Sequence, residues 1–247
     1  MKNLIKIVIL LVAVLIVDSP KVNAQNYNMS RQITNTALSL DQYIKRFDNG
    51  VDLNDVKSYK GTPYNSPNFL IGNVYENSTL LASDIALRYN AVSDEIEVKE
   101  SLTVPNEEAK VLTKSVDIYV KINGDIFIFA PYQGGIEEGG YFQVLFEGTQ
   151  YSFYKKIIKK FTPAKKASSS ITTDTPAMFQ DKPVYYIVTK KGRYYEFPSS
   201  KSKKIKVFGS QKEAIKKYVK ENGLDLNKEK DLKKAVIYFD SLEGSKL

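Results

Sequence analysis

The stretch VDIYVKI (Val116–Ile122), followed by Asn123-Gly124 and then by DIFIFA (Asp125–Ala130), decides the fold class. In the first run apolar residues alternate with other residues, which is the period of a β-strand that buries one face. Asn-Gly is the strongest short-range indication of a two-residue hairpin turn, because both turn residues must adopt positive φ angles. The stretch therefore predicts two antiparallel strands joined by a tight turn.

Further short runs of the same kind lie on both sides of this hairpin. They are Asp84–Asn90, Asp94–Lys99, Tyr141–Glu147, Gln150–Tyr154, Val184–Val188 and Arg193–Phe197. Gly148 separates two of these runs, and Lys190-Lys191-Gly192 separates the last two, as hairpin turns do. The segment 162–176 is rich in Ser, Thr and Pro and predicts a long loop. Most of the chain after residue 61 thus indicates antiparallel β-structure.

The last part of the chain changes to a helical period. Two apolar faces recur there at helical spacing: Ile215, Tyr218 and Val219 on the first, and Leu232, Ala235, Val236 and Phe239 on the second. Ser210 and Glu213 have the spacing of a capping box, Gly223 is placed to end the first helix, and Asn227 can cap the second. A short link between two such helices makes an antiparallel pair.

We therefore predict an α+β fold, an antiparallel β-sheet or sandwich with a C-terminal antiparallel helical pair. The expected divisions are a signal peptide at 1–24, a polar and partly helical segment at 25–60, a β-rich domain at 61–208, and a helical hairpin packed on that domain at 209–247.

The N-terminus has the three parts of a secretory signal. Lys2 and Lys6 form a positive head, Ile7–Val17 is an uninterrupted apolar run, and Val22 and Ala24 are the small residues that a signal peptidase reads. The run is shorter than the roughly 20 apolar residues that cross a bilayer. We expect cleavage after Ala24, which leaves 247 − 24 = 223 residues and no transmembrane anchor. The expected location is the periplasm, with a membrane-peripheral or extracellular location as the alternative.

The composition excludes several kinds of chemistry. Neither cysteine nor histidine occurs among the 247 residues, which removes disulfides, the Ser-His-Asp arrangement and the usual general base at neutral pH. Zinc and copper lose their common ligands as well. We therefore expect no metal site and no cofactor, and a binding protein rather than an enzyme.

Charge is distributed unevenly along the chain. From Gln25 to Gln150 there are 10 Lys and Arg against 17 Asp and Glu, a net charge of −7, whereas from Tyr151 to Leu247 there are 23 against 10, a net charge of +13. Such asymmetry indicates an anionic partner for the basic half. The alternative is that the two halves neutralise each other within one domain.

Two lysine-rich stretches concentrate the positive charge, and both are candidate contacts with an anionic surface: Lys155, Lys156, Lys159 and Lys160, and Lys201, Lys203, Lys204 and Lys206. As a helix, residues 154–161 would gather four lysines on one side, which suits a membrane surface. As a strand, they would place lysines on both faces, and the turn at Gly148 favours the strand. A solvated charged face is the alternative interpretation. Tyrosines near the second stretch suit nucleic acid, but export argues against that partner.

Four acidic residues are candidates for catalysis. Asp94, Glu95 and Glu97 lie close together in the sequence, and Glu137 lies between two glycine pairs. Paired carboxylates hydrolyse glycosidic bonds when they face each other about 5 to 9 Å apart. The sequence thus leaves open a carboxylate-dependent hydrolase of envelope carbohydrate, although acids of this kind are most often ordinary surface residues.

Several segments resemble those of a family of exported proteins of Bacteroidetes, of flavobacterial type: Gly61-Thr62-Pro63-Tyr64, Leu87-Arg88-Tyr89-Asn90 followed by Asp94-Glu95, Phe161–Ala164, and the two lysine-rich C-terminal helices. No activity is assigned to that family, so the resemblance implies a Gram-negative envelope location and a non-enzymatic role, and it identifies no functional residue. Proteins that such bacteria pass through the outer membrane usually end in a β-sandwich sorting domain, whereas this chain ends in predicted helices, which favours the periplasm.

The function that we expect is therefore that of a periplasmic or envelope binding or scaffolding protein. Its basic C-terminal half would contact an anionic surface or another envelope protein.

Overall fold

The computed structural model describes residues 44–45, 59–131, 139–167, 171, 173–242 and 247, which fall in one compact unit, residues 40–247. The predicted signal peptide at 1–24 and most of the segment 25–60 lie outside the described residues. Of that segment, Ile44–Lys45 is a strand, so the short helix expected in its first part is wrong at these two positions. Tyr59–Lys60 is also a strand.

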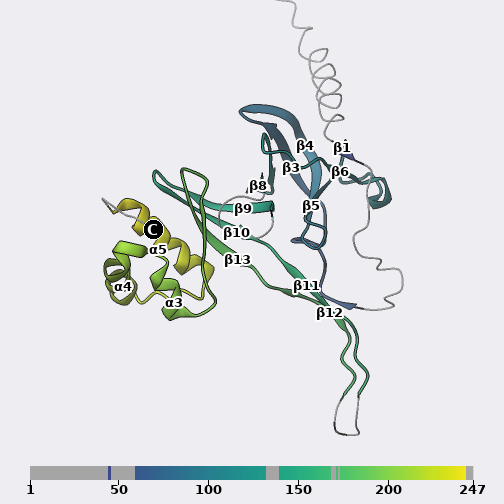
Figure 1. Ribbon diagram of the computed structural model, residues 1–247. Helices are drawn as coiled ribbons and strands as arrows, with labels where there is room; N and C mark the ends of the chain where they lie inside the picture. Colours follow the sequence, from purple (N-terminus) through teal and green to yellow (C-terminus); the bar gives the residue numbers. More distant parts are fainter. Residues whose placement is uncertain (1–43, 46–58, 132–138, 168–170, 172, 243–246) are drawn as a thin grey trace, which may run out of the picture. The chain divides into compact units, whose positions relative to one another are not determined.

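Antiparallel β-structure dominates the described chain, as predicted (Figure 1). The main sheet has eleven strands in the order β1-β6-β5-β4-β3-β7-β8-β9-β10-β13-β14. Their bounds are β1 (Ile44–Lys45), β3 (Leu70–Glu76), β4 (Thr79–Asn90), β5 (Glu95–Lys99), β6 (Lys110–Leu112), β7 (Ile118–Ile122), β8 (Asp125–Ala130), β9 (Gly140–Glu147), β10 (Tyr151–Lys156), β13 (Val184–Thr189) and β14 (Tyr194–Glu196). A second sheet contains β11 (Lys159–Thr162), β12 (Ala177–Asp181) and β2 (Tyr59–Lys60), of which β12 and β2 are parallel.

The predicted hairpin at the centre of the sequence is confirmed. β7 and β8 pair in antiparallel fashion, and Asn123 and Gly124 in the turn have φ angles of 49° and 91°. Ile118, Val120 and Ile122 are buried in alternation, but Val116 lies before the strand and is exposed. The second predicted hairpin, β13 to β14, also forms, with Gly192 at φ 74°.

Residues 154–161 are extended, which settles the helix-or-strand alternative in favour of the strand. β10 ends at Lys156 and β11 begins at Lys159. The predicted loop 162–176 is only partly a loop. The backbone groups of Lys165 and Thr175 exchange two hydrogen bonds of 2.8 Å, which continue the pairing of β11 with β12.

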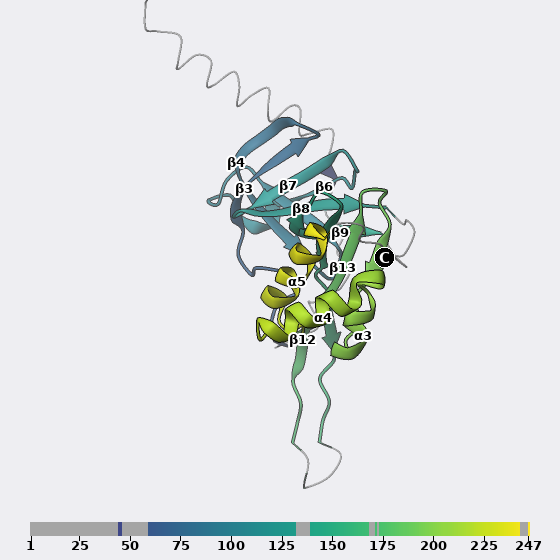
Figure 2. The ribbon, with the colours of Figure 1, turned by 90° about the vertical axis from the view of Figure 1, so that its left-hand side faces the viewer.

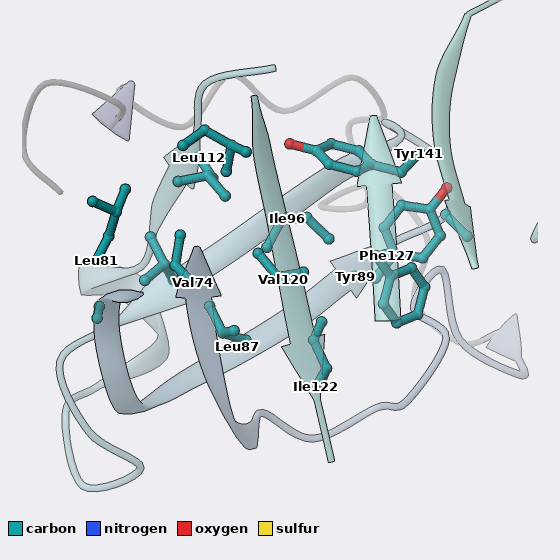
Figure 3. Packing of buried hydrophobic residues seen from close by; sticks show 14 of the residues in the cluster. Val74, Leu81, Leu87, Tyr89, Ile96, Leu112, Val120, Ile122, Phe127 and Tyr141 are labelled. Carbon is teal, nitrogen blue, oxygen red and sulfur yellow. The ribbon is translucent and has the colours of Figure 1, made fainter. Parts of the chain in front are cut away.

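The main sheet curls around a core built from its first strands (Figure 3). The side chains of this core come from β3 to β9 and include Val74, Leu87, Ile96, Val120 and Phe127. Tyr89 of β4 contacts both Phe127 of β8 and Tyr141 of β9, with ring centroids 5.3 and 6.2 Å apart. Since β3, β7 and β8 lie between β4 and β9 in the sheet order, this contact requires strong curvature of the sheet.

Three helices cover the far end of the sheet: α3 (Lys201–Lys206), α4 (Lys212–Glu221) and α5 (Glu229–Ser241). α5 lies on β9 and β10, α4 packs against α5, and α3 packs against α4 (Figure 2). The predicted inner face of α5 is confirmed, because Leu232, Ala235, Val236 and Phe239 are all buried against sheet residues such as Phe153.

The ends of the helices differ from prediction. α3 was not predicted and precedes the expected boundary at residue 209. Two short 3₁₀ turns, η1 (Asn106–Glu108) and η2 (Gly209–Gln211), also form, and Ser210 lies within η2 rather than at the cap of α4. Asn227 does not cap α5, whose N-cap is Lys228. Gly223 does end α4, with φ 60°, as predicted.

Asp240 of α5 fixes the helical layer to the sheet. Its carboxylate accepts hydrogen bonds from the backbone N–H groups of Thr149 (2.9 Å), Gln150 (2.7 Å) and Tyr151 (2.7 Å), at the turn between β9 and β10. A Cβ atom at Gly148 would collide with this carboxylate, so the close approach requires glycine. Burial disfavours the ionised form, but the backbone donors outweigh it and hold the pKa of Asp240 below its ordinary value.

Replacing Asp240 with Asn should lower the free energy of unfolding at neutral pH by about 2–4 kcal/mol, because an amide loses the charge-assisted bonds and turns N–H groups toward N–H donors. A group whose folded pKa is lowered contributes stability above its unfolded pKa and loses it as the pH falls through the folded pKa. The difference in the free energy of unfolding between the unaltered protein and the Asp240→Asn variant should therefore be constant near neutral pH. It should shrink as the pH falls below 3.8, the ordinary pKa of an aspartate.

Urea unfolding at a series of pH values measures this difference. Glu221→Gln, on the exposed side of α4, removes the same charge and serves as the control. An equal loss in both variants, or a loss that does not change down to about pH 2, would contradict the role of Asp240.

Candidate functional site

Asp94, a predicted catalytic acid, lies in the turn between β4 and β5. Its φ angle is 57°, in the left-handed region that Asp enters more readily than most residues. Its carboxylate accepts hydrogen bonds from the Tyr89 hydroxyl (2.6 Å) and the Tyr141 backbone N–H (3.1 Å). It also forms ion pairs with Lys156 Nζ (3.0 Å) and Lys114 Nζ (3.5 Å). One side chain thus joins the β4–β5 turn to β9 and β10.

The surroundings of Asp94 are closely packed. A Cβ atom at Gly140 would collide with both the Asp94 carboxylate and Lys156 Nζ, and Gly140 has φ 144°, so glycine is required there. Burial, with a further contribution from Asp94, raises the pKa of Tyr89 well above 10.0. The Tyr89 hydroxyl therefore stays protonated at neutral pH and donates to Asp94, which acts as a structural acceptor.

Glu97 lies on the opposite face of the β4–β5 pair. Its neighbours in the strand, Ile96 and Val98, belong to the core, so Glu97 points away from that core. It is fully buried and accepts hydrogen bonds from Arg88 Nε (2.8 Å) and Nη2 (2.5 Å). The guanidinium group lies 3.6 Å from the ring centroid of Tyr64 and 4.2 Å from that of Phe69. Glu97 is therefore the counterion of a buried, stacked arginine.

The remaining predicted acids give the hydrolase alternative no support. The Oε2 atom of Glu95 is buried and has no hydrogen-bond partner among the described residues. The same is true of the hydroxyl oxygen of Tyr141. Glu137 lies outside the described residues. Asp94 and Glu97 are each bound to cationic partners on opposite faces, so these two do not form an open pair. In the described ranges no group of three or more Asp and Glu side chains is placed to hold a metal ion.

The lysines of the first predicted stretch do not share one surface. Lys155 pairs with Glu229 of α5 at 2.8 Å, on the face that carries the helices. Lys156 pairs with Asp94 on the other face, and Lys159 pairs with Asp181 of β12 at 2.5 Å. Only Lys160 of the four is classed as exposed. Three of the four lysines thus bind other elements of the same chain.

The second predicted stretch coincides with α3 and divides in a similar way. Lys204 is buried, and its Nζ donates to Leu226 O and to Asn227 Oδ1, both at 3.0 Å. Burial lowers the pKa of Lys204. Lys201, Lys203 and Lys206 are exposed. Lys204 holds the segment before α5, while the other three face solvent.

Two groups of candidate functional residues were not predicted from the sequence. Lys212 and Lys220 of α4 are exposed and extend the lysines of α3 over the outer helices. Asn65, Asn68, Asn123 and Asp125 surround a small pocket at the β7–β8 turn. A spacing of four residues between helical lysines could have indicated the first group, whereas the second joins segments that are distant in the sequence.

Comparison with known proteins identifies no relative: no family model matches the chain, and neither the curated proteins nor the solved structures give a match. None of the helices in the described ranges is long and apolar enough to cross a bilayer. The site is therefore interpreted from its own geometry.

Replacing Asp94 with Asn should lower the free energy of unfolding by about 2–4 kcal/mol, because the half-buried Lys156 loses its ion pair with Asp94 and the Tyr89 hydroxyl loses a charged acceptor. In a double-mutant cycle with Lys156→Gln, the two losses should be less than additive by about 1 kcal/mol or more. Glu213→Gln is the control, since Glu213 and its partner Lys216 are 75% and 70% exposed. Its loss should stay below about 1 kcal/mol.

Urea unfolding of the four proteins of the cycle gives the coupling energy directly. Additive losses, or an Asp94→Asn protein as stable as the unaltered chain, would show that Asp94 does not hold the sheet and would return it to the list of candidate catalytic acids.

Proposed function

We propose that the protein is an exported binding or scaffolding protein of the bacterial envelope that attaches to an anionic lipid surface through its helical layer. The observation that carries the proposal is the division of the lysines. Three of the four lysines at 155–160 are bound within the fold, whereas most of those on α3 and α4 face solvent. We name four of them the basic helical face: Lys203, Lys206, Lys212 and Lys220.

The basic helical face is exposed, and its lysines form no ion pair with any other residue in the described ranges. Lys212, Lys216 and Lys220 are spaced by four residues and therefore lie along one side of α4. The core side of the same helix carries Ile215 and Val219, which are buried. The geometry thus directs the lysines outward, away from the sheet.

The charge of the whole layer supports the same interpretation. Residues 201–242 contain 12 lysines and 6 Asp and Glu, a net charge of +6. Each lysine near an acidic membrane contributes about 1 kcal/mol, so four give about 4 kcal/mol. The attraction acts over roughly 8 to 10 Å at physiological salt. We expect reversible, salt-sensitive attachment rather than insertion.

The envelope location rests on other support, namely the secretory pattern of the first 24 residues and the resemblance to exported proteins. The basic half of the chain then meets acidic lipid headgroups from the side to which the protein is exported. A protein partner with an acidic surface is the competing occupant, and the experiment below separates the two.

The test is sedimentation of the protein with vesicles of phosphatidylcholine, with and without phosphatidylglycerol. Changing Lys203, Lys206, Lys212 and Lys220 to Gln should weaken binding to acidic vesicles at low salt by about 100-fold or more, given about 1 kcal/mol for each lysine. The control changes Lys165, Lys166, Lys190 and Lys191, which are exposed on hairpins, to Gln. This control variant removes the same charge and should weaken binding to acidic vesicles only a few-fold.

Equal losses in the two quadruple variants would reduce the proposal to general electrostatic attraction. If the unaltered protein does not bind acidic vesicles at low salt, the lipid surface is excluded and a protein partner remains. Both variants should keep the fold, because none of the eight side chains is buried. Circular dichroism checks this.

A further inference from the structure

A small pocket opens between the loop at 65–68 and the turn that joins β7 to β8. Its base consists of side chains from the curled core, namely Leu87, Tyr89, Ile122 and Phe127, which Figure 3 shows together. Its rim consists of Asn65, Asn68, Asn123 and Asp125. The pocket therefore combines an apolar floor with a polar edge, the usual composition of a site for a small ligand.

The rim side chains are available to a ligand. Asn65, Asn68, Asn123 and Asp125 are exposed, and within the described ranges their side chains form no hydrogen bond. The positions of the loop and the turn are nevertheless fixed by the backbone. The N–H of Asn65 donates to Tyr89 O at 2.9 Å, and the N–H of Asn123 donates to Ile71 O at 3.0 Å. Three amides and one carboxylate thus stand around the opening on a backbone that is held in place.

Arg88 lines one side of the pocket. The donors of its guanidinium group are taken by Glu97 and by the Pro67 carbonyl, the latter at 3.2 Å. Because Glu97 neutralises Arg88, this side carries no net charge, and it offers few free donors for an anion. Asp125 at the rim repels an anion further. The pocket therefore disfavours an anionic ligand.

The size of the pocket restricts the ligand to a small group. Its free volume is about 40 Å³, and one water needs about 10–15 Å³ of such space, so it accepts about three waters. An acetamido group has a similar size. Its methyl group suits the apolar floor, and its N–H and C=O suit a carboxylate and an amide at the rim. A hydroxyl group alone would leave the floor unused, and an alkyl group would leave the rim unpaired.

We propose that this pocket binds the acetamido group of an N-acetylated amino sugar. The rim has more polar groups than one acetamido group can use, and the remaining amides can pair with the hydroxyl groups of the sugar ring outside the pocket. This site is independent of the basic helical face, because its lining residues lie on β3, β4, β7, β8, the β7–β8 turn and the loop at 65–68, whereas α5 packs on β9 and β10.

Saturation-transfer NMR on the mature protein tests the proposal, with N-acetylglucosamine as the probe and glucose, glucosamine and N-acetylalanine methylamide for comparison. The methyl protons of N-acetylglucosamine should receive the strongest saturation, with a Kd of about 1–10 mM for so small a ligand. Glucose and glucosamine should bind at least about tenfold more weakly, since they lack the acetyl group. Weaker binding by the acetylated amino acid is expected because it lacks the ring hydroxyls.

Asn68→Ala and Asp125→Asn should each weaken binding of the probe by about fivefold to tenfold through the loss of a hydrogen bond. Both residues are exposed and without internal side-chain bonds, so the fold should persist. Asp117→Asn, an exposed acid just before β7, is the control and should change nothing. The proposal is overturned by absent binding, by equal saturation from glucose, by tighter binding of the acetylated amino acid, or by rim variants that bind like the control.

Discussion

The interaction of Asp94 with β9 and β10 closes the curl of the main sheet. Strands β4 and β5 are separated from β9 by β3, β7 and β8 in the sheet order, and a flat sheet would hold these elements far apart. Asp94 brings the β4–β5 turn against Tyr141 and Lys156. The curl in turn encloses the first hydrophobic core. Gly140 allows the contact, because any side chain there would occupy the position of the carboxylate.

The same use of charge recurs at other points where elements meet. Asp240 binds the backbone of the β9–β10 turn, Lys204 binds the segment before α5, and Lys155 joins β10 to α5 through Glu229. Such buried or half-buried groups are costly to leave unpaired, which makes them structural. Most lysines of α3 and α4 take no part in such buried contacts and face solvent on the outer helices. The helical lysines are proposed as the binding surface because they face solvent, and not because lysines are frequent in this part of the sequence.

Local patterns were sufficient to predict most of the fold, but not the site. The alternation around Asn123-Gly124 and the apolar face from Leu232 to Phe239 are set within a few residues, so the β7–β8 hairpin and α5 could be inferred directly. Strands β3, β6 and β12 and helix α3 were not predicted. The partners of Asp94 and Lys156 depend on register and curvature, which bring together residues 47 and more positions apart. Lys204 lies in a run of lysines, and no local feature distinguishes the one that is buried. The pocket rim consists of turn-forming residues whose juxtaposition appears only in three dimensions.

The central claim is that Lys156, Lys159 and Lys204 serve the fold and that the exposed lysines of α3 and α4 serve binding. Acetylation of surface amines, followed by mass spectrometry with and without acidic vesicles, tests it residue by residue. Lys203, Lys206, Lys212 and Lys220 should react quickly in the free protein and become protected when vesicles are present, while Lys156, Lys159 and Lys204 react slowly in both states. If Lys156 and Lys159 react as fast as Lys212, or if vesicles protect them and leave the helical lysines reactive, the account is contradicted.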